Sequence, residues 1–162
     1  LDAMFNLGRY FQGEGDDLPR ALELFRQGSE AGSGDCTCAL GLCCEEGDGV
    51  EQSWEEAVRL YEKAAGQGSP WAMGNLAWCY DNGQGVEKSP EQAAAWYKKG
   101  AELGAPRCLC SLGWCYEAGG GVEQSWAVIC RYLETGGALL DTFEDGEPLR
   151  TLRKVWCQLG RR

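Results

Sequence analysis

The chain has 162 residues, a net charge of −10 and no histidine. The acidic balance argues against a nucleic-acid partner and an anionic membrane surface, which both attract Lys and Arg. No apolar run approaches the ~20 residues of a membrane-spanning helix. The lack of histidine removes the usual general base near neutral pH and the commonest metal ligand. Catalysis and metal binding are therefore disfavoured.

An internal repeat of 36 residues organises most of the chain. Leucine, glycine, valine and serine positions recur three times at this spacing. A shorter first unit aligns with them, because Leu7 lies 33 residues before Leu40. The recurring positions are Leu40, Leu76 and Leu112; Gly47, Gly83 and Gly119; Val50, Val86 and Val122; and Ser53, Ser89 and Ser125.

The sequence pattern of each unit predicts a helix, a glycine-rich turn and a second helix. In the first unit the turn is Gly13-Glu14-Gly15. In the second, Ser53 precedes the second helix as an N-cap. The four predicted units cover about residues 1–33, 34–69, 70–105 and 106–137.

The third unit shows the helix signals most fully. Leu76 and Tyr80 share one face of its first helix, at helical spacing. Gly83 stops that helix, because glycine tolerates the left-handed conformation that follows a helix end. Ser89 caps the second helix, and Gln92 can complete a capping box.

Helices joined by short turns lie antiparallel, and one such hairpin cannot bury its own apolar face. The units must therefore stack. The small residues Gly41, Ala77 and Gly113 suit close helix crossings. We predict an all-α fold, a right-handed α-α superhelix (an α-solenoid) of antiparallel helix-turn-helix units.

The last stretch, residues 138–162, departs from the repeat. Pro148, Leu152, Trp156 and Leu159 suggest one more amphipathic helix. Such a helix would cap the last hairpin. The alternative is a divergent tail.

These motifs resemble those of the Sel-one-like repeat family, a bacterial-rich relative of the tetratricopeptide repeat. The resemblance covers about residues 2–137. It implies adaptors or scaffolds that bind partners in a groove lined by the first helices. The residues that carry it are Leu76-Ala77, Tyr80, Gly83-Gln84-Gly85-Val86, Ala93, Trp96-Tyr97 and Gly104, with counterparts in the other units.

Seven of the ten cysteines follow the repeat, which indicates helix positions and not a metal framework. Cys43, Cys79 and Cys115 lie 36 residues apart. Buried cysteine behaves as a small hydrophobe. Because no Cys-x-x-Cys knuckle occurs, no metal site is predicted.

By the resemblance, a cysteine-rich exported branch pairs a late cysteine of one unit with one eight residues on. Here those positions are Ala65 and Met73, then Ala101 and Leu109. Thiols that lack this pairing pattern suit a reducing compartment. We expect a cytoplasmic location, or export if a signal peptide has been removed.

Side chains opposite the core stripe of each first helix form the candidate binding groove. At about 100° per residue, Trp71 and Trp78 lie roughly opposite Leu76. Aromatic anchors with a charged border suit a peptide-holding surface; alternatively, these tryptophans pack between first helices. Trp54 and Trp126 are expected to pack within their own hairpins and hold the two helices together. The candidate residues are Leu42, Glu45, Glu46, Trp71, Trp78, Asp81, Asn82, Arg107, Trp114 and Glu117.

We therefore expect a protein-interaction module or scaffold, without cofactor. Its partner would be a protein or peptide segment with an apolar anchor and basic residues. The first alternative is an architectural spacer within a longer array. The second is a hydrolase using Glu45, Glu46 and Asp81, which are predicted to be exposed; no nucleophile–base pair can be named, so no enzyme is expected.

Overall fold

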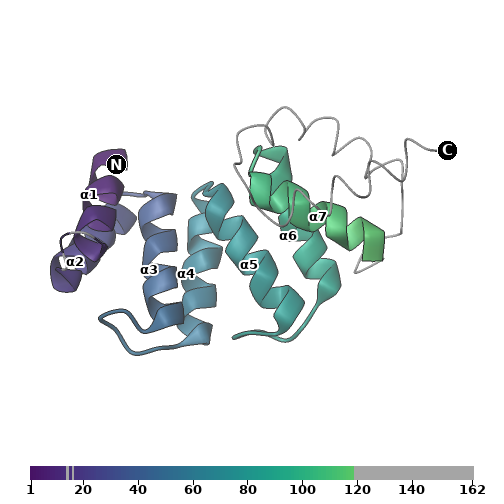
Figure 1. Ribbon diagram of the computed structural model, residues 1–162, viewed down its shortest axis with the longest axis horizontal. Helices are drawn as coiled ribbons and strands as arrows, with labels where there is room; N and C mark the ends of the chain where they lie inside the picture. Colours follow the sequence, from purple (N-terminus) through teal and green to yellow (C-terminus); the bar gives the residue numbers. More distant parts are fainter. Residues whose placement is uncertain (14, 16, 119–162) are drawn as a thin grey trace.

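The computed structural model describes residues 1–13, 15 and 17–118, and this part of the chain is helical between its turns (Figure 1). The predicted all-α repeat superhelix is confirmed. The predicted second helix of the fourth unit, Trp126 and the predicted C-terminal helix lie outside the described residues. No described helix is long and apolar enough to cross a membrane. The helices are α1 (Asp2–Gln12), α2 (Leu18–Glu30), α3 (Gly34–Glu46), α4 (Trp54–Gly66), α5 (Pro70–Asn82), α6 (Pro90–Glu102) and α7 (Pro106–Ala118).

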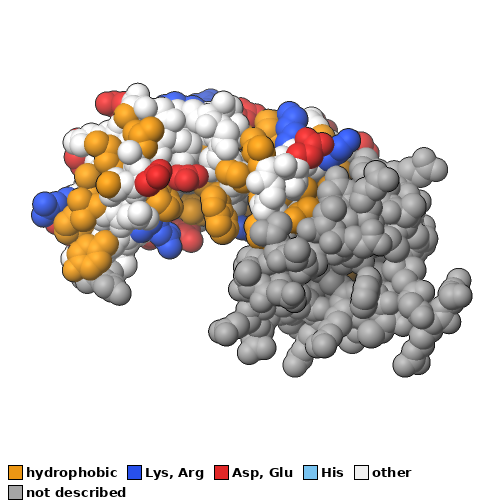
Figure 2. All heavy atoms as spheres, turned by 90° about the horizontal axis from the view of Figure 1, so that it is seen from above, with side chains coloured by type: hydrophobic (Ala, Val, Ile, Leu, Met, Phe, Trp, Pro, Cys, Tyr) orange, Lys and Arg blue, Asp and Glu red, His pale blue; other side chains and the backbone are white. Residues whose placement is uncertain are grey.

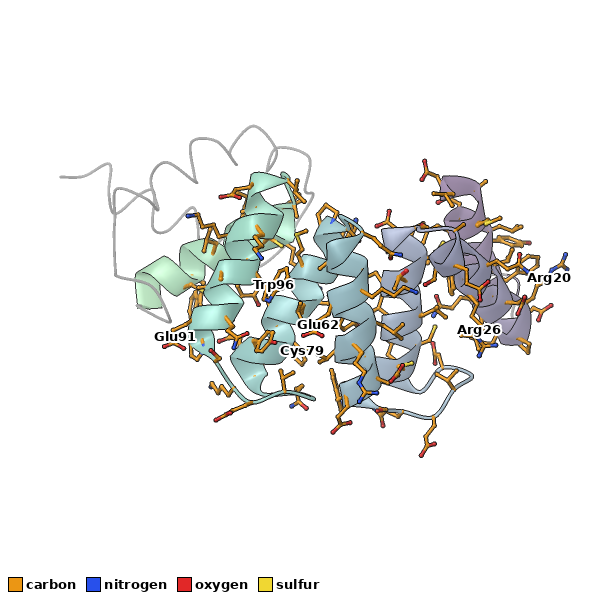
Figure 3. The ribbon with its side chains drawn as sticks, turned by 180° about the vertical axis from the view of Figure 1, so that it is seen from behind. Arg20, Arg26, Glu62, Cys79, Glu91 and Trp96 are labelled. Carbon is orange, nitrogen blue, oxygen red and sulfur yellow. The ribbon has the colours of Figure 1, made fainter. Side chains whose placement is uncertain are left out.

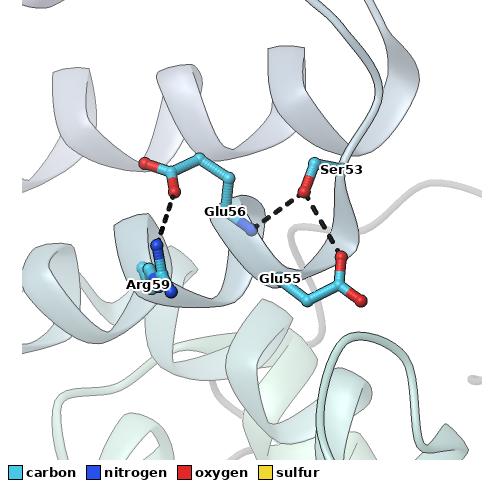
Figure 4. Close-up of polar contacts among 4 residues, drawn as sticks. All are labelled: Ser53, Glu55, Glu56 and Arg59. Atoms are coloured by element: carbon cyan, nitrogen blue, oxygen red, sulfur yellow. Dashed lines mark hydrogen bonds and ion pairs between the residues drawn. The ribbon is translucent and has the colours of Figure 1, made fainter.

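Serine side chains cap α3, α4, α5 and α6, as predicted for Ser53. Its Oγ accepts a hydrogen bond from the backbone N–H of Glu56 at 3.3 Å, and donates to Glu55 Oε2 at 3.3 Å (Figure 4). Glu56 also pairs with Arg59 at 3.3 Å. Both charged side chains are exposed, so the ion pair adds little stability and the cap is the more important contact.

The capping box predicted at the start of α6 forms only in half. Ser89 Oγ accepts from the Gln92 backbone N–H at 3.3 Å, as expected. The reciprocal bond is not made, because the Ser89 N–H donates to the Tyr80 carbonyl at 2.8 Å. The connection between α5 and α6 is thus closed by a backbone hydrogen bond.

The glycine-rich turn of the third unit also joins two units. Gly83 ends α5 in the left-handed conformation, with φ of 72°, which confirms its predicted role. Gly85 has φ of 68°. A Cβ atom there would overlap the backbone carbonyl of Trp54, at the start of α4. The turn therefore packs directly on the preceding unit's second helix.

Within each hairpin, an aromatic ring of the second helix packs on a small residue of the first. A Cβ atom at Gly41 would lie 2.5 Å from the ring of buried Tyr61. A Cβ atom at Gly8 would likewise overlap the Phe25 ring. These glycines therefore set the distance between the two helices of their hairpins. The prediction that Gly41 serves a close crossing is confirmed.

Between hairpins, a second pair of small residues meets. A Cβ atom on Gly28, in α2, would lie 2.8 Å from Cys36 Cβ and closer still to its Sγ, in α3. Gly100 in α6 meets Cys108 in α7 in the same way. The corresponding positions of the middle joint are Ala64 and Ala72, both fully buried. Glycine thus faces cysteine at two joints and alanine takes both positions at the third.

The hairpins stack side by side in chain order into an elongated body (Figure 1), which Figure 2 shows from above. Each of the first helices α1, α3 and α5 contacts the next first helix, whereas successive second helices make fewer contacts. The stack therefore curves, with the first helices on its inner side. This agrees with the side on which the resemblance places a groove.

We predict that the two residues of each glycine–cysteine pair share one space, so that substitutions at the two positions have non-additive effects on stability. Gly28→Ala should destabilise the fold by about 1–3 kcal/mol through overpacking. Gly28→Ala/Cys36→Ala recreates the Ala64–Ala72 pair and should recover that loss. Urea unfolding of the natural chain, both single variants and the double variant measures the coupling. Additive effects of the two substitutions would contradict a shared space.

Candidate functional site

The side of α3, α5 and α7 turned away from the second helices is here called the first-helix face. Two hydrogen bonds run across it. Arg107 Nη1 donates to Asn75 Oδ1 at 3.1 Å, and Asn75 Nδ2 donates to Cys38 Sγ at 3.6 Å. At one end, Ser69 Oγ donates to Asp35 Oδ1 at 2.7 Å. These bonds tie the three helices side by side.

Asn75 is a residue of this face that sequence reasoning missed. Its counterparts in the neighbouring units are Ala39 and Ser111, so the register shows no recurring polar type. The one feature that could have identified Asn75 is its side-chain amide, which can both donate and accept a hydrogen bond. In the structure it uses both functions and holds the exposed Arg107 against the face.

Two of the predicted aromatic residues are strongly exposed. Trp71 retains 64% of its surface and Trp114 retains 60%. Both project from the side of their helices that points away from buried Leu76 and Leu112. An indole left in water at this level contributes little to the core and is available to a partner.

Trp78, predicted as a residue of the binding groove, is less accessible than Trp71 and Trp114. It is half-buried, and its ring lies 5.7 Å from that of Trp54 at an angle of 31°. Trp54, expected to staple its own hairpin, thus packs across the joint between α4 and α5. Leu42 is also half-buried against the same core cluster. Leu42 and Trp78 are thus partly covered by the core, and their role as contact residues stays a prediction.

The acids of the face are not equivalent. Glu45, predicted to be exposed, is half-buried, and its Oε2 accepts a hydrogen bond from Tyr61 Oη at 2.6 Å. Burial raises the pKa of Tyr61 well above its ordinary value, and the bond to Glu45 raises it further. Glu45 therefore belongs to the contact that closes its hairpin. Glu46 is exposed and Asp81 is half-buried, contrary to its predicted exposure.

Two further candidates lie at the end of the face. Asn82 is exposed, and its Nδ2 donates to the Trp78 carbonyl at 2.9 Å. Glu117 lies on α7, but its side chain falls outside the described residues. The exposed part of the face therefore consists of Glu46, Trp71, Asn82, Arg107 and Trp114.

The opposite side of the molecule has a different character. From behind, charged side chains of both signs project from the second helices, among them Arg26, Glu62 and Glu91 (Figure 3). The aromatic residue there, Trp96, is half-buried, and Lys99 Nζ lies 4.0 Å from its ring centroid. The mixed charges resemble an ordinary solvated surface. The exposed indoles distinguish the first-helix face.

The cysteines serve as packing residues. Six of the described thiols are buried. Burial raises the pKa of Cys38 to about 12, with Asp35 adding to the effect. A thiol with such a pKa is protonated near neutrality and is a poor nucleophile and metal ligand. Among the described residues, no group of three potential ligands is placed to hold a metal ion. Cys130 and Cys157 lie outside this part of the chain.

The Sel1 repeat family matches residues 1–33, 34–69, 72–104 and 106–125, which together make up most of the sequence. The chain belongs to the Sel1 repeat family. Proteins of this family generally serve as protein–protein interaction modules and are typically non-enzymatic scaffolds. No curated protein matches the chain.

Solved structures of other Sel1 proteins have the same architecture. One is c5321, a protective antigen of uropathogenic Escherichia coli with an SLR fold, 33% identical with a TM-score of 0.76, covering 85% of this chain and 30% of its own. Another is a Sel1 repeat protein from Oxalobacter formigenes, 26% identical with a TM-score of 0.74, covering 84% and 55%. Helicobacter pylori cysteine rich protein B, 22% identical, shares the fold with a TM-score of 0.61, covering 76% and 88%. The chain therefore spans about a third and about half of the first two, and bacterial membership agrees with the prediction.

The buried thiols predict a loss of stability at alkaline pH. Folding raises the pKa of Cys38 from 9.0 to about 12, and those of Cys43, Cys79, Cys108 and Cys115 from 9.0 to about 11. As the pH rises above 9, the unfolded chain releases these protons first. Each thiol's contribution is therefore complete below pH 9 and is lost as the pH rises through its folded pKa.

The measurement is the free energy of unfolding in urea at several values between pH 7 and pH 11. Cys38→Ala lacks one of the titrating groups and should show a shallower decline than the natural chain. Ultraviolet absorbance of the thiolates gives the pKa values of the cysteines directly, once in the folded chain and once in the urea-unfolded chain. Equal thiolate titration in the folded and urea-unfolded chain would contradict burial as the cause.

Proposed function

We propose that this Sel1 module binds a segment of another protein on its first-helix face. The observation that supports this most strongly is the exposure of Trp71 and Trp114, at 64% and 60%. Tryptophan is among the residues that contribute most binding energy when a partner covers them. The internal hydrogen bonds of Arg107 and Asn75 hold the surface around them in place. Binding would then lose little energy to ordering the face.

The partner segment should combine an apolar side chain with basic residues. The indoles provide the apolar contact. Glu46 and Asp81, near the C-terminal ends of α3 and α5, supply negative charge, to which those helix ends add their own partial negative charge. Such charges raise association rates and select partners more than they add affinity. Glu45 contributes less, because Tyr61 already occupies one of its oxygens.

An architectural spacer remains the second candidate function. It is favoured by the length of the solved relatives, of which this chain covers 30% and 55%. In that role the first-helix face would have no partner. For the site of action, we propose a reducing compartment, which is supported by the eight free cysteines of the described residues. We assign no catalysis to Glu45, Glu46 and Asp81, since Glu45 is engaged with Tyr61.

We predict that Trp71→Ala/Trp114→Ala abolishes partner binding and leaves the fold intact. Both indoles are exposed, so their removal should cost little stability. The natural chain and the variant would serve as bait for protein from the source cell, with retained proteins quantified by mass spectrometry. Proteins bound at this face should fall by about tenfold or more.

Leu103→Ala is the matched control, because Leu103 is 55% exposed but follows α6, outside the first-helix face. It should retain the same proteins as the natural chain. Circular dichroism checks that all three chains are equally helical. Adding salt should slow association markedly. If the double variant retains the same proteins as the natural chain, binding does not use this face. If the association rate does not depend on salt, the acidic residues do not contribute to association.

A further inference from the structure

Arg107 is the one basic residue on the helices that form the first-helix face. Neither α3 nor α5 contains a lysine or an arginine, and α7 contains only Arg107. Its side chain is exposed, and no carboxylate of the described residues forms an ion pair with it. A partner that covers this cation loses binding energy unless it offers an anion, because burying an unpaired charge is costly.

The guanidinium group of Arg107 is held in place on the neighbouring helix. Its Nη1 donates to Asn75 Oδ1 at 3.1 Å, so the side chain reaches from α7 to α5. The Asn75 amide is itself oriented, because its Nδ2 donates to Cys38 Sγ at 3.6 Å. The bond to Asn75 uses one of the five N–H donors of an arginine, and no other described residue accepts from the rest. An arginine held in this way loses little side-chain entropy when it binds a ligand.

Exposed indoles lie along both helices that meet at this guanidinium. Trp71 precedes Asn75 by four residues, about one turn, so the two side chains lie on the same side of α5. Trp114 follows Arg107 by seven residues, about two turns, and shares its side of α7. A partner that covers the indoles therefore excludes water from the cation between them. Charge pairing is stronger where water is excluded.

We propose that Arg107 binds the carboxylate of an aspartate or glutamate side chain in the partner segment, next to the apolar residue that contacts Trp71. This inference rests on the proposed function of the first-helix face and adds an acidic residue to the partner. A guanidinium and a carboxylate match in shape and can form two parallel hydrogen bonds. The segment thus carries charges of both signs, an acid for Arg107 and bases for Glu46 and Asp81.

The positions of the charges on α5 set the spacing of residues in the segment. Asp81 follows Asn75, which holds the guanidinium, by six residues, or about 9 Å along the helix axis. An extended segment that runs along α5 covers this distance in about three residues. The acidic residue is therefore expected about three positions from a basic residue, with an apolar residue beside it.

The test selects peptides from a library of random dodecapeptides displayed on phage. Each peptide is joined to the coat protein at its C-terminal end, so aspartate and glutamate side chains are its only carboxylates. The baits are the natural chain, Trp71→Ala/Trp114→Ala and Arg107→Glu. Peptides that prefer the natural chain to the tryptophan variant should carry an acidic residue beside an apolar one, with lysine or arginine about three positions away. On Arg107→Glu, the acidic position should change to lysine or arginine.

Arg26→Glu is the matched control, because it makes the same charge reversal at an exposed arginine of α2, on the opposite side of the molecule (Figure 3). It should select the same motif as the natural chain. Circular dichroism checks that every bait is folded.

The affinity of one selected peptide separates charge recognition from a structural role of Arg107. Replacing the acidic residue of the peptide by its amide should weaken binding to the natural chain by about tenfold. The same replacement should have little effect on binding to Arg107→Gln, which can still donate to Asn75 but has no charge. A tenfold loss with both chains would mean that Arg107 does not bind the carboxylate. This comparison decides alone if Arg107→Glu fails to fold.

Two further outcomes would overturn this inference and leave the binding face in place. One is a set of tryptophan-dependent peptides without an acidic residue, and the other is the same motif on Arg107→Glu as on the natural chain. If the natural chain selects no peptide, or the tryptophan variant selects the same peptides, the proposed function itself fails.

Discussion

The close approach of helices at residues without a bulky side chain is the contact on which the rest of this structure depends. Inside the first two hairpins, the rings of Phe25 and Tyr61 occupy the space that a Cβ atom would fill at Gly8 and Gly41. Between hairpins, Cys36 fills the corresponding space beside Gly28. Because interiors are packed without spare volume, these contacts fix both the spacing within a hairpin and the spacing between hairpins. Cys36, and Cys108 beside Gly100, are thus explained as residues of suitable volume.

This packing decides which aromatic residues remain for binding. Trp78 packs on Trp54 in the joint between α4 and α5, whereas Trp71 and Trp114 stay exposed. The hydrogen bonds from Arg107 to Asn75 and from Asn75 to Cys38 then hold α3, α5 and α7 in fixed register. The proposed binding surface is therefore a consequence of how the repeat stacks.

Most of the fold could be predicted from the sequence because its signals recur. The spacing of Leu40, Leu76 and Leu112, the glycine turns and the serine caps each repeat, and local chemistry explains every one. The surface was less predictable, because it depends on partners distant in sequence. Helical geometry placed Trp78 roughly opposite Leu76 but could not show that Trp54, at the start of α4, would cover it. Nor could it show that Tyr61 would hold Glu45, since that bond joins residues 16 positions apart.

The free energy of unfolding of Gly41→Ala tests the central packing contact most directly. Helix propensity alone favours alanine over glycine by about 1 kcal/mol, so the sign of the change separates the two effects. If the Tyr61 ring fills the space beside Gly41, the substitution should destabilise the chain by about 1–3 kcal/mol. Gly66→Ala, at the end of α4 where nothing lies within 4 Å of an added Cβ, is the matched control and should be neutral or stabilising. A Gly41→Ala chain as stable as the natural one, or more stable, would contradict the account.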